Sequence, residues 1–275
     1  MKISTWNVNG IRARELEVWD WLERERPQIL CLQEIKASPG DVPKRLAQRD
    51  SHWSYWHGHK GYSGVGLALE KATFPTRPAF FHPEFDAENR IVCAAIEDLV
   101  VASVYVPNGN KDYPAKIRFL EGLEQWIIAR QAEQRRVVIC GDLNVARAER
   151  DVHPKLRNPA QIGQSPEERA LFERILGRGL VDLLRDHHQD DDELFTWWAP
   201  WRNMRERNIG WRLDYVLCTP SVAERARACD ALRQYGTSDH GPVTAIFDGP
   251  LVDLSGRPID PSVPPPPTGQ LGLFR

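Results

Sequence analysis

The sequence places polar side chains directly after several of its apolar segments. They are carboxylates, amides and one histidine: Asn7, Glu34, Asp142, Asn144, Asp214, Asp239 and His240. Carboxylate and amide oxygens are the ligands that Mg²⁺ or Mn²⁺ prefers in proteins. Zinc is disfavoured, because the cysteines of the chain lack the spacing of zinc ligands. These residue types therefore predict hard-cation chemistry, provided that the fold brings them together.

The apolar segments before these residues have the composition of strands. They are rich in Val, Ile, Leu or aromatic residues, and turn residues bound them. The predicted strands are Lys2–Trp6, Ile29–Gln33, Gly64–Leu69, Ile91–Ile96, Leu99–Val106, Val137–Cys140, Leu213–Cys218 and Val243–Phe247. In α/β proteins, sites form at the ends of strands and in the loops after them. We therefore expect the polar clusters to converge on one pocket.

Helical patterns alternate with the predicted strands, which is typical of an α/β layered domain. One helix is predicted over Glu15–Glu25, with Leu16, Trp19 and Leu22 on its apolar face. Another begins after Ser165, where the sequence Ser-Pro-Glu-Glu has the form of a capping box with Pro at the first helical position.

The composition excludes several classes of protein. The chain has 275 residues, of which 41% are hydrophobic and 27% charged, so most of it is expected to fold. The net charge is −2, and a polyanionic partner would therefore need a local basic face. No apolar stretch approaches the about 20 residues that cross a bilayer, and no signal-peptide pattern opens the sequence. The five cysteines lack C-x-x-C spacing and are predicted as buried, reduced thiols. We expect a cytoplasmic, monomeric protein without a membrane partner.

Two regions differ in composition. Residues 1–248 carry the predicted strands and helices and are expected to form one catalytic domain. Residues 249–275 include seven prolines, so we expect an extended, flexible tail.

Eight motifs occur in a characteristic order along residues 1–248. They are WNVNGIRA (6–13), LQEIK (32–36), GYSGVG (61–66), YVPNG (105–109), GDLNVA (141–146), FTWW (195–198), NIGWRLDY (208–215) and SDHGPV (238–243). In this order they resemble the exonuclease III family of apurinic/apyrimidinic (AP) endonucleases. The wider superfamily includes inositol polyphosphate phosphatases, but only the DNA-repair branch is similar in the WN-x-NG, Y-x-PNG and GWR-x-DY motifs.

The resemblance implies a DNase I-like, four-layer α/β sandwich, in which helices flank two packed mixed sheets and the site lies at one rim. It implies Mg²⁺ as the cofactor, with Mn²⁺ as a substitute. Glu34 would be the main metal ligand, with Asn7 close by and Asp239 contributing to the same or a second position. The metal would screen phosphate charge and stabilise the departing 3′ oxygen.

The resemblance also assigns catalytic roles. Asp142, held by Asn144, would activate the attacking water, while His240, oriented by Asp214, would bind the scissile phosphate. A histidine with a carboxylate partner also suits a general base, so the opposite assignment to His240 stays open. Tyr105 would place its phenol on the phosphate, as phenol or as phenolate.

Duplex DNA with abasic sites or blocked 3′ ends is the substrate that the resemblance implies. Four arginines interleave with tryptophans over 197–212, and arginine binds phosphates well. The expected DNA-binding residues are Arg12, Asn108, Lys111, Trp197, Arg202, Arg205, Arg207, Trp211, Arg212 and Leu213. Of these, Trp197, Trp211 and Leu213 would shape a pocket for the abasic sugar.

The tail ends in a peptide that resembles the segment with which bacterial repair proteins dock on the DNA sliding clamp. Gln270 would make a polar contact, while Leu271, Leu273 and Phe274 supply the apolar part of the motif. A sliding clamp is therefore a second expected partner.

Two other functions fit parts of the sequence. A phosphatase of inositol phosphates or lipids would share the fold, but the GWR-x-DY and YVPNG motifs argue against it. A catalytically silent module that binds DNA or the clamp would not need Glu34, Asp142, Asn144, Asp214 and His240 together.

Overall fold

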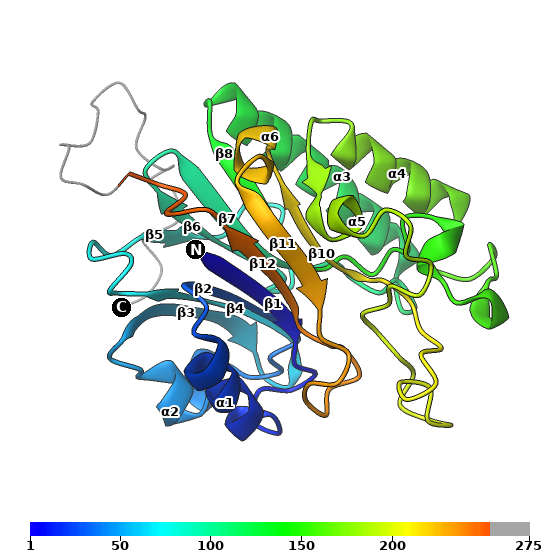
Figure 1. Cartoon of the computed structure of the whole chain (residues 1–275), viewed down its shortest axis with the longest axis horizontal. Coiled ribbons are helices and arrows are strands. Elements are labelled where there is room, and N and C mark those ends of the chain that lie inside the picture. Colours follow the sequence, from blue (N-terminus) through cyan, green and yellow to red (C-terminus); the bar gives the residue numbers. More distant parts are fainter. Residues whose placement is uncertain (254–275) are drawn as a thin grey trace.

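Two six-stranded β-sheets pack face to face in the computed structural model, which describes residues 1–253 (Figure 1). The first sheet has the order β11 (Ala226–Ala231), β12 (Val243–Phe247), β1 (Lys2–Asn7), β2 (Ile29–Gln33), β4 (Tyr62–Glu70), β3 (His52–His59). The second has the order β5 (Ala79–Phe81), β6 (Ile91–Ile96), β7 (Leu99–Tyr105), β8 (Arg136–Asp142), β10 (Asp214–Cys218), β9 (Val181–Asp182). Both sheets are mixed, because β1 and β2 are parallel, as are β7 and β8.

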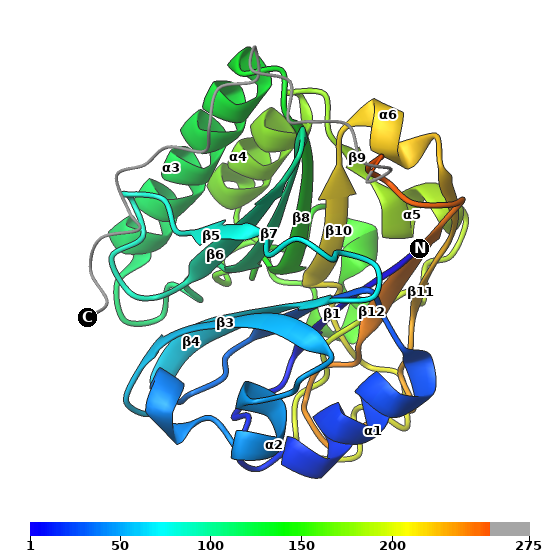
Figure 2. The ribbon, with the colours of Figure 1, turned by 90° about the vertical axis from the view of Figure 1, so that its left-hand side faces the viewer.

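Helices cover the outer faces of the two sheets (Figure 2). The first sheet is covered by α1 (Glu15–Glu25) and α2 (Lys44–Ala47). The second is covered by α3 (Tyr113–Ala132) and α4 (Pro166–Leu176). The shorter helices are α5 (Leu183–His187) and α6 (Pro220–Ala223), with 3₁₀ turns at Pro39–Asp41, Glu149–Asp151 and Pro154–Leu156. The four layers are those that the sequence motifs implied.

The core between the sheets consists of alternating strand side chains, and apolar helix faces seal the outer layers. All five cysteines, Cys31, Cys93, Cys140, Cys218 and Cys229, are buried and form no disulfide, as the sequence predicted. Within residues 1–253, no helix has the length and apolarity to cross a bilayer. The expected clamp-binding residues Gln270, Leu271, Leu273 and Phe274 lie outside the described part of the chain.

The predicted helix starts are confirmed, but one predicted helix face is wrong. At α4, Ser165 Oγ accepts from the amide of Glu168, whose carboxylate accepts from the amide of Ser165, so the capping box is present. In α1, Leu16 is 68% exposed, and Val18, Trp21 and Leu22 form the buried face instead. The reason is that this face packs against Trp6 and the sheet.

Four strands of the described chain were not predicted from the sequence: β3, β5, β9 and β11. The segment HWSYWHGH of β3 combines polar and aromatic side chains, all of them partly exposed, because it is an edge strand. β5 and β9 contain only three and two residues, and β11 carries few large apolar side chains. Such segments give a weak apolar periodicity, so the pattern that identified the central strands could not find them.

The strand register explains why the polar clusters meet. Asn7 pairs with Gln33, which precedes Glu34, at the ends of parallel β1 and β2. Asp142 pairs with Tyr105 on one side and with Asp214 on the other, since β10 begins where β8 ends. The ends of four strands and the start of a fifth therefore lie at one rim of the sandwich.

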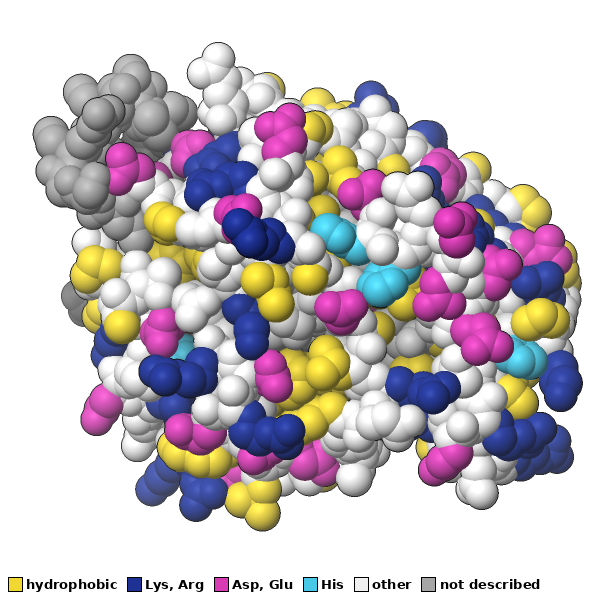
Figure 3. Space-filling model, viewed as in Figure 1, with side chains coloured by type: hydrophobic (Ala, Val, Ile, Leu, Met, Phe, Trp, Pro, Cys, Tyr) yellow, Lys and Arg dark blue, Asp and Glu magenta, His cyan; other side chains and the backbone are white. Residues whose placement is uncertain are grey.

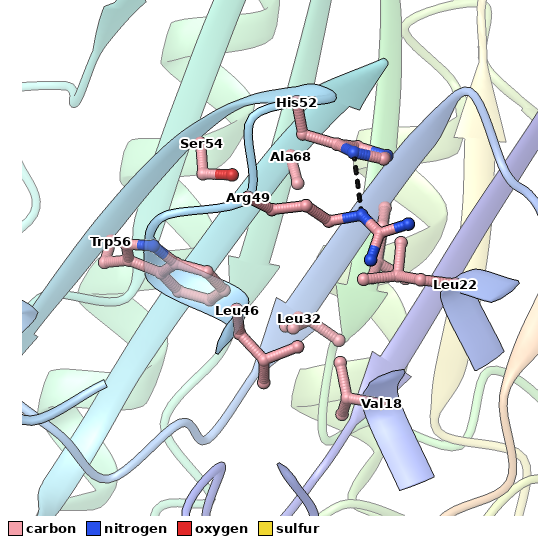
Figure 4. A pocket seen from close by; sticks show the side chains of 10 residues that line it. Val18, Leu22, Leu32, Leu46, Arg49, His52, Ser54, Trp56 and Ala68 are labelled. Atoms are coloured by element: carbon pink, nitrogen blue, oxygen red, sulfur yellow. Dashed lines mark hydrogen bonds between the residues drawn. The ribbon is translucent and has the colours of Figure 1, made fainter. Parts of the chain in front are cut away.

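A small cavity lies between α1, α2 and the first sheet. It has a volume of about 10 Å³, lined by apolar side chains and by Arg49 and His52. Figure 4 shows the Arg49 guanidinium beside the His52 ring, where Nε–H donates to Nδ1 over 3.2 Å. Because Nδ1 accepts this bond, the ring is held neutral. Burial, and next the Arg49 charge, lower the pKa of His52 to about 4.

This lowered pKa predicts an acid-labile contribution to stability. In the unfolded chain His52 takes up a proton near its ordinary pKa of about 6.5, whereas in the folded protein it stays neutral until about pH 4. The unfolding free energy is therefore highest above pH 6.5 and decreases as the pH falls toward 4. Between about pH 7 and pH 4.5, wild type should lose about 1 kcal/mol more unfolding free energy than His52→Gln, a value discounted for the partial exposure of the ring. Urea denaturation measures it. His59→Gln, on the same strand, is the control and should lose as much unfolding free energy as wild type. If His52→Gln and wild type lose equal amounts, the lowered pKa of His52 is wrong.

Candidate active site

A cavity of about 310 Å³ opens at the rim where the strand ends meet. Its walls hold carboxylates, amides, a tyrosine, a histidine and two tryptophans. The lining residues are Asn9, Glu34, Lys36, Tyr105, Asn108, Asn110, Asp142, Asn144, Gln161, Ile162, Trp197, Trp211, Leu213, Asp239 and His240. Ten of these were singled out from the sequence, so one pocket does collect most of the predicted site.

Two buried carboxylates flank the imidazole of His240. The Nδ1–H donates to Asp214 Oδ2 over 2.8 Å, while Nε2 lies 3.7 Å from Asp142 Oδ2. The three side chains are each at most 5% exposed. Asp214 lies behind the ring and does not line the cavity, so it orients His240 rather than meeting a ligand itself.

This arrangement favours a positively charged ring. Burial alone would lower the pKa of His240, but the charges of Asp214 and then Asp142 outweigh it and raise the pKa to about 10. Burial raises the pKa of Asp142, although the charge on His240 opposes the increase. At neutral pH His240 is therefore an imidazolium facing the cavity, which suits it to stabilise negative charge and not to accept a proton.

Asp142 is fixed by its neighbours in addition to His240. Its Oδ2 accepts from the Asn7 amide nitrogen over 2.9 Å, and its Oδ1 accepts from the backbone amide of Asn144 over 2.9 Å. Gly141 precedes it with φ at +149°, and a Cβ there would meet the carbonyl oxygen of Val104 at 1.9 Å. Only glycine fits at this point of β8, so the strand can deliver Asp142 to the rim.

Left-handed backbone recurs in the loops of the site. Asn9, Glu34, Lys36 and Asn144 all have φ between +44° and +54°. Non-glycine residues adopt this conformation at an energetic penalty, and such strain concentrates at functional sites. In these loops the left-handed conformation turns the backbone sharply where a strand ends.

Apart from the protonated His240 ring, the cavity offers only hard ligands to a cation. The carboxylates of Glu34, Asp142 and Asp239 face it, and no cysteine does. The Lys36 ammonium lies 2.9 Å from Glu34 Oε1, so this carboxylate already has a positive charge beside it. Asp239 is held by hydrogen bonds from Asn9 to Oδ1 and from the Trp197 indole to Oδ2. The oxygen donors expected for Mg²⁺ therefore fit the site.

An apolar wall faces these charged groups. Trp197 and Trp211 meet edge to face with ring centroids 5.7 Å apart, and Leu213 lies beside Trp211. Thr196 Oγ1 accepts from the amides of both Leu213 and Asp214, which links this wall to the carboxylate behind His240.

Tyr105 presents a neutral phenol. Burial, and then the charges of Glu34 and Asp142, raise the pKa of Tyr105 well above its ordinary value. The Arg90 guanidinium lies over the ring, 4.9 Å from its centroid. Of the two forms expected from the sequence, this environment favours the phenol, which can donate a hydrogen bond.

The expectation that Arg212 contacts DNA is wrong, because this side chain has no exposed surface. Its guanidinium pairs with Asp151 and Asp182 in the interior, at 2.7 and 2.8 Å. Burial alone would raise the pKa of Asp151, but Arg212 and Arg185 lower it below its ordinary value. Arg212 is thus a structural residue beneath the tryptophan wall.

The other expected basic residues also lie outside the cavity lining. The Arg205 guanidinium donates hydrogen bonds to four backbone carbonyls and so holds the loop that leads to Asp239. The carbonyls are those of Arg233, Tyr235, Gly236 and Ser238. The remaining four are exposed: Arg12, Lys111, Arg202 and Arg207. On the face in Figure 3, basic and acidic side chains intermingle without forming one basic patch.

Five residues that line the cavity were not predicted from the sequence. Asn9 and Lys36 stand inside the motifs WNVNG and LQEIK, which could have identified them. Asn110, Gln161 and Ile162 belong to irregular loops, for which no periodicity signals a position in the pocket.

A buried ion pair beneath these loops was also missed. Lys116 Nζ and Glu168 Oε1 are 2.5 Å apart and fully buried, and Lys116 donates to the Asn144 carbonyl over 2.7 Å. Glu168 accepts from the amide of Gly163, next to Ile162. The pair therefore ties two helices to two loops of the cavity.

Residues 4–240 match the model of the Endonuclease/Exonuclease/phosphatase family. The chain is 33% identical over 256 residues to an exodeoxyribonuclease of Bacillus subtilis, a match that covers 90% of this chain and all of the relative. Among solved structures it is similar to an AP endonuclease from Archaeoglobus fulgidus, with a TM-score of 0.81 and 33% identity over 90% of this chain and all of that one. It is also similar to a 3′-5′ exonuclease from Neisseria meningitidis, with a TM-score of 0.82 and 30% identity at the same coverage. The chain therefore belongs to the Endonuclease/Exonuclease/phosphatase family, and its resemblance to the exonuclease III branch is confirmed.

Proposed function

We propose that this protein is a Mg²⁺-dependent DNA-repair nuclease that cleaves duplex DNA 5′ to abasic sites and also removes nucleotides or blocking groups from 3′ ends. One observation carries the proposal: the imidazolium of His240 and the carboxylate of Asp142 face the same cavity as an apolar wall of two tryptophans. His240 and Asp142 suit phosphodiester hydrolysis, and the tryptophan wall suits the binding of a sugar without a base. The names of the relatives, which include AP endonuclease and exodeoxyribonuclease, agree with it.

Asp142 acts as the general base in this proposal. It takes a proton from water, the resulting hydroxide attacks phosphorus, and the bond between phosphorus and the 3′ oxygen breaks. The departing 3′ oxygen then takes up a proton from solvent water. The products are a 3′-hydroxyl and a 5′-deoxyribose phosphate. Its raised pKa makes Asp142 a better proton acceptor than an exposed carboxylate. Asn7 and Asn144 hold the carboxylate in position for that transfer.

His240 binds a non-bridging phosphate oxygen. As an imidazolium it offsets the charge that develops on the phosphate, and its hydrogen bond to Asp214 fixes the ring. Tyr105, which lines the same cavity, adds a phenolic hydrogen bond. These groups are charged or oriented before the substrate arrives, so little reorganisation accompanies the reaction.

Glu34 and Asp239 would hold the Mg²⁺ ion, with Asn7 near it. When bound, the ion supplies Lewis-acid stabilisation of charge on the phosphate and the departing oxygen. The hard oxygen donors of the cavity support this choice of metal.

The tryptophan wall selects the abasic nucleotide. Trp197, Trp211 and Leu213 present an apolar surface on which a base-free deoxyribose can pack, whereas an inositol phosphate would bring hydroxyl groups that such a wall leaves unpaired. The exposed residues Arg12, Lys111, Arg202 and Arg207 are available for backbone phosphates.

Cleavage of a defined lesion tests the proposal. A labelled duplex with one tetrahydrofuran abasic analogue should be cut once, 5′ to the analogue, in Mg²⁺ and not in EDTA, while the undamaged duplex stays intact apart from slow shortening at its 3′ end. Gel electrophoresis resolves these products. If neither duplex is cut, the proposed function is wrong; equal shortening of both would leave only the exonuclease part of it.

Asp142→Asn should lower the rate of cleavage by about a hundredfold or more, because it removes the general base. Binding of the abasic duplex, measured by fluorescence anisotropy, should persist and show that the variant is folded. Asp190→Asn, at an exposed position, is the matched control and should cleave as wild type does.

We also propose that the last residues of the chain dock on a bacterial sliding clamp, as the motif formed by Gln270, Leu271, Leu273 and Phe274 suggests. Deletion of residues 270–275 should abolish co-elution with a purified clamp and leave cleavage of short duplexes unchanged. Co-elution that survives the deletion would exclude this peptide as the docking element.

A further inference from the structure

A second group of metal-ligating side chains lies outside the catalytic cavity. It consists of His57, His82 and Asp86, which we call the histidine cluster, and its ligand atoms all lie within 4.8 Å of one another. The two imidazole rings stack at a centroid distance of 4.3 Å with an interplanar angle of 12°. The Nε2 atom of His57 lies 2.9 Å from Asp86 Oδ2. None of these residues lines the catalytic cavity or has a role in the proposed reaction.

The cluster joins the edges of the two sheets. His57 belongs to β3, the edge strand of the first sheet, while His82 and Asp86 follow β5, the edge strand of the second. Figure 2 shows these two edges facing one another. Tyr55 and Phe80 confirm the contact, because their rings stack with centroids 5.5 Å apart. A metal link here would therefore add a cross-link between the edges of two sheets that already share a hydrophobic core.

Asp86 is held in place for a ligand role. Its Oδ1 accepts from the backbone amide of Arg90 over 2.8 Å, so its carboxylate has a fixed orientation with Oδ2 directed at His57. The carboxylate has no exposed surface, and the His57 side chain is 11% exposed. A ligand oxygen whose carboxylate is already hydrogen-bonded to the backbone is the usual arrangement around protein-bound metals.

We propose that the histidine cluster binds one divalent transition-metal ion of the Zn²⁺ class, which cross-links the two sheets at this edge. Two imidazoles and one carboxylate are a common zinc ligand set, with water in the fourth position. Imidazole nitrogens favour such ions over Mg²⁺, so this site and the oxygen-rich catalytic cavity would take different metals. The spacing of Nε2 and Oδ2 is close to that of two ligand atoms on one tetrahedral ion. The His82 ring, which is stacked on His57, would have to turn out of the stack to direct a nitrogen at the same ion.

The charge state of the cluster agrees with this role. Burial, and next the nearby His57, lower the pKa of His82, so its ring is neutral at physiological pH, as a metal ligand must be. An ion would take the place of the proton that His57 and Asp86 share, and it would offset the charge of the buried carboxylate.

The test uses the full-length protein, stripped with EDTA and returned to buffer with excess Mg²⁺, which keeps the catalytic cavity supplied with its own metal. Zn²⁺ alone is the probe. Competition with a chromophoric zinc chelator should show one equivalent bound, and at about a hundredfold excess over the dissociation constant the melting temperature should rise by about 5 °C. Co²⁺ in place of Zn²⁺ should give the visible absorption of an ion with nitrogen ligands.

Three variants locate the ion. His57→Gln and His82→Gln should each weaken Zn²⁺ binding about tenfold or more and remove the thermal shift. Asp86→Asn, which keeps an oxygen for the Arg90 amide, should also weaken binding. His59→Gln, an exposed histidine on the same strand, is the matched control and should bind as wild type does.

Two results would overturn the proposal. One is the absence of stoichiometric Zn²⁺ binding in wild type. The other is binding that survives His57→Gln and His82→Gln but is lost in Glu34→Gln, because the ion would then occupy the catalytic cavity. Neither readout depends on DNA cleavage, so the proposal stands or fails separately from the proposed function.

Discussion

The site depends on the burial of two carboxylates against one imidazole. Burial of Asp142 and Asp214 costs each carboxylate several kcal/mol of hydration, which a nearby positive charge must offset. A protonated His240, 3.7 Å from Asp142 and 2.8 Å from Asp214, offsets part of this negative charge. The remaining negative charge, together with Glu34 and Asp239, makes the open side of the cavity attractive to a cation. One constraint thus accounts for the imidazolium and for the proposed metal.

The fold satisfies this constraint through strand register. Asp142 and Asp214 are paired across β8 and β10, and His240 reaches them from the segment before β12, which belongs to the other sheet. The three groups therefore stay together only while the two sheets stay packed. Beneath them, Arg212 and Lys116 form buried ion pairs that fix the tryptophan wall and the Asn144 loop. These pairs explain why so many charged side chains lie inside a domain whose reaction occurs at its rim.

Most of the site could be predicted from the sequence, because its residues follow apolar strands whose ends must share a sheet edge. Glu34, Asp142 and His240 were identified in this way, and the motif order supplied the four-layer arrangement that strand counting alone could not. Arg212 was misjudged because a motif does not reveal burial: its partners Asp151 and Asp182 lie 61 and 30 residues away in sequence. The histidine cluster was not predicted for a similar reason, since edge strand β3 has weak periodicity and its partners come from the other sheet.

The proposed reaction depends on a positively charged His240 ring, and nitrogen NMR measures this charge directly. In protein with labelled histidine, in buffer without Mg²⁺ and with His240→Asn for assignment, both ring nitrogens of His240 should remain protonated through about pH 8.5 and titrate with a pKa of about 10. That result would support phosphate binding by an imidazolium and leave Asp142 as the base. A ring that loses its proton between about pH 6 and 7, like a free histidine, would contradict the account and return the role of general base to His240.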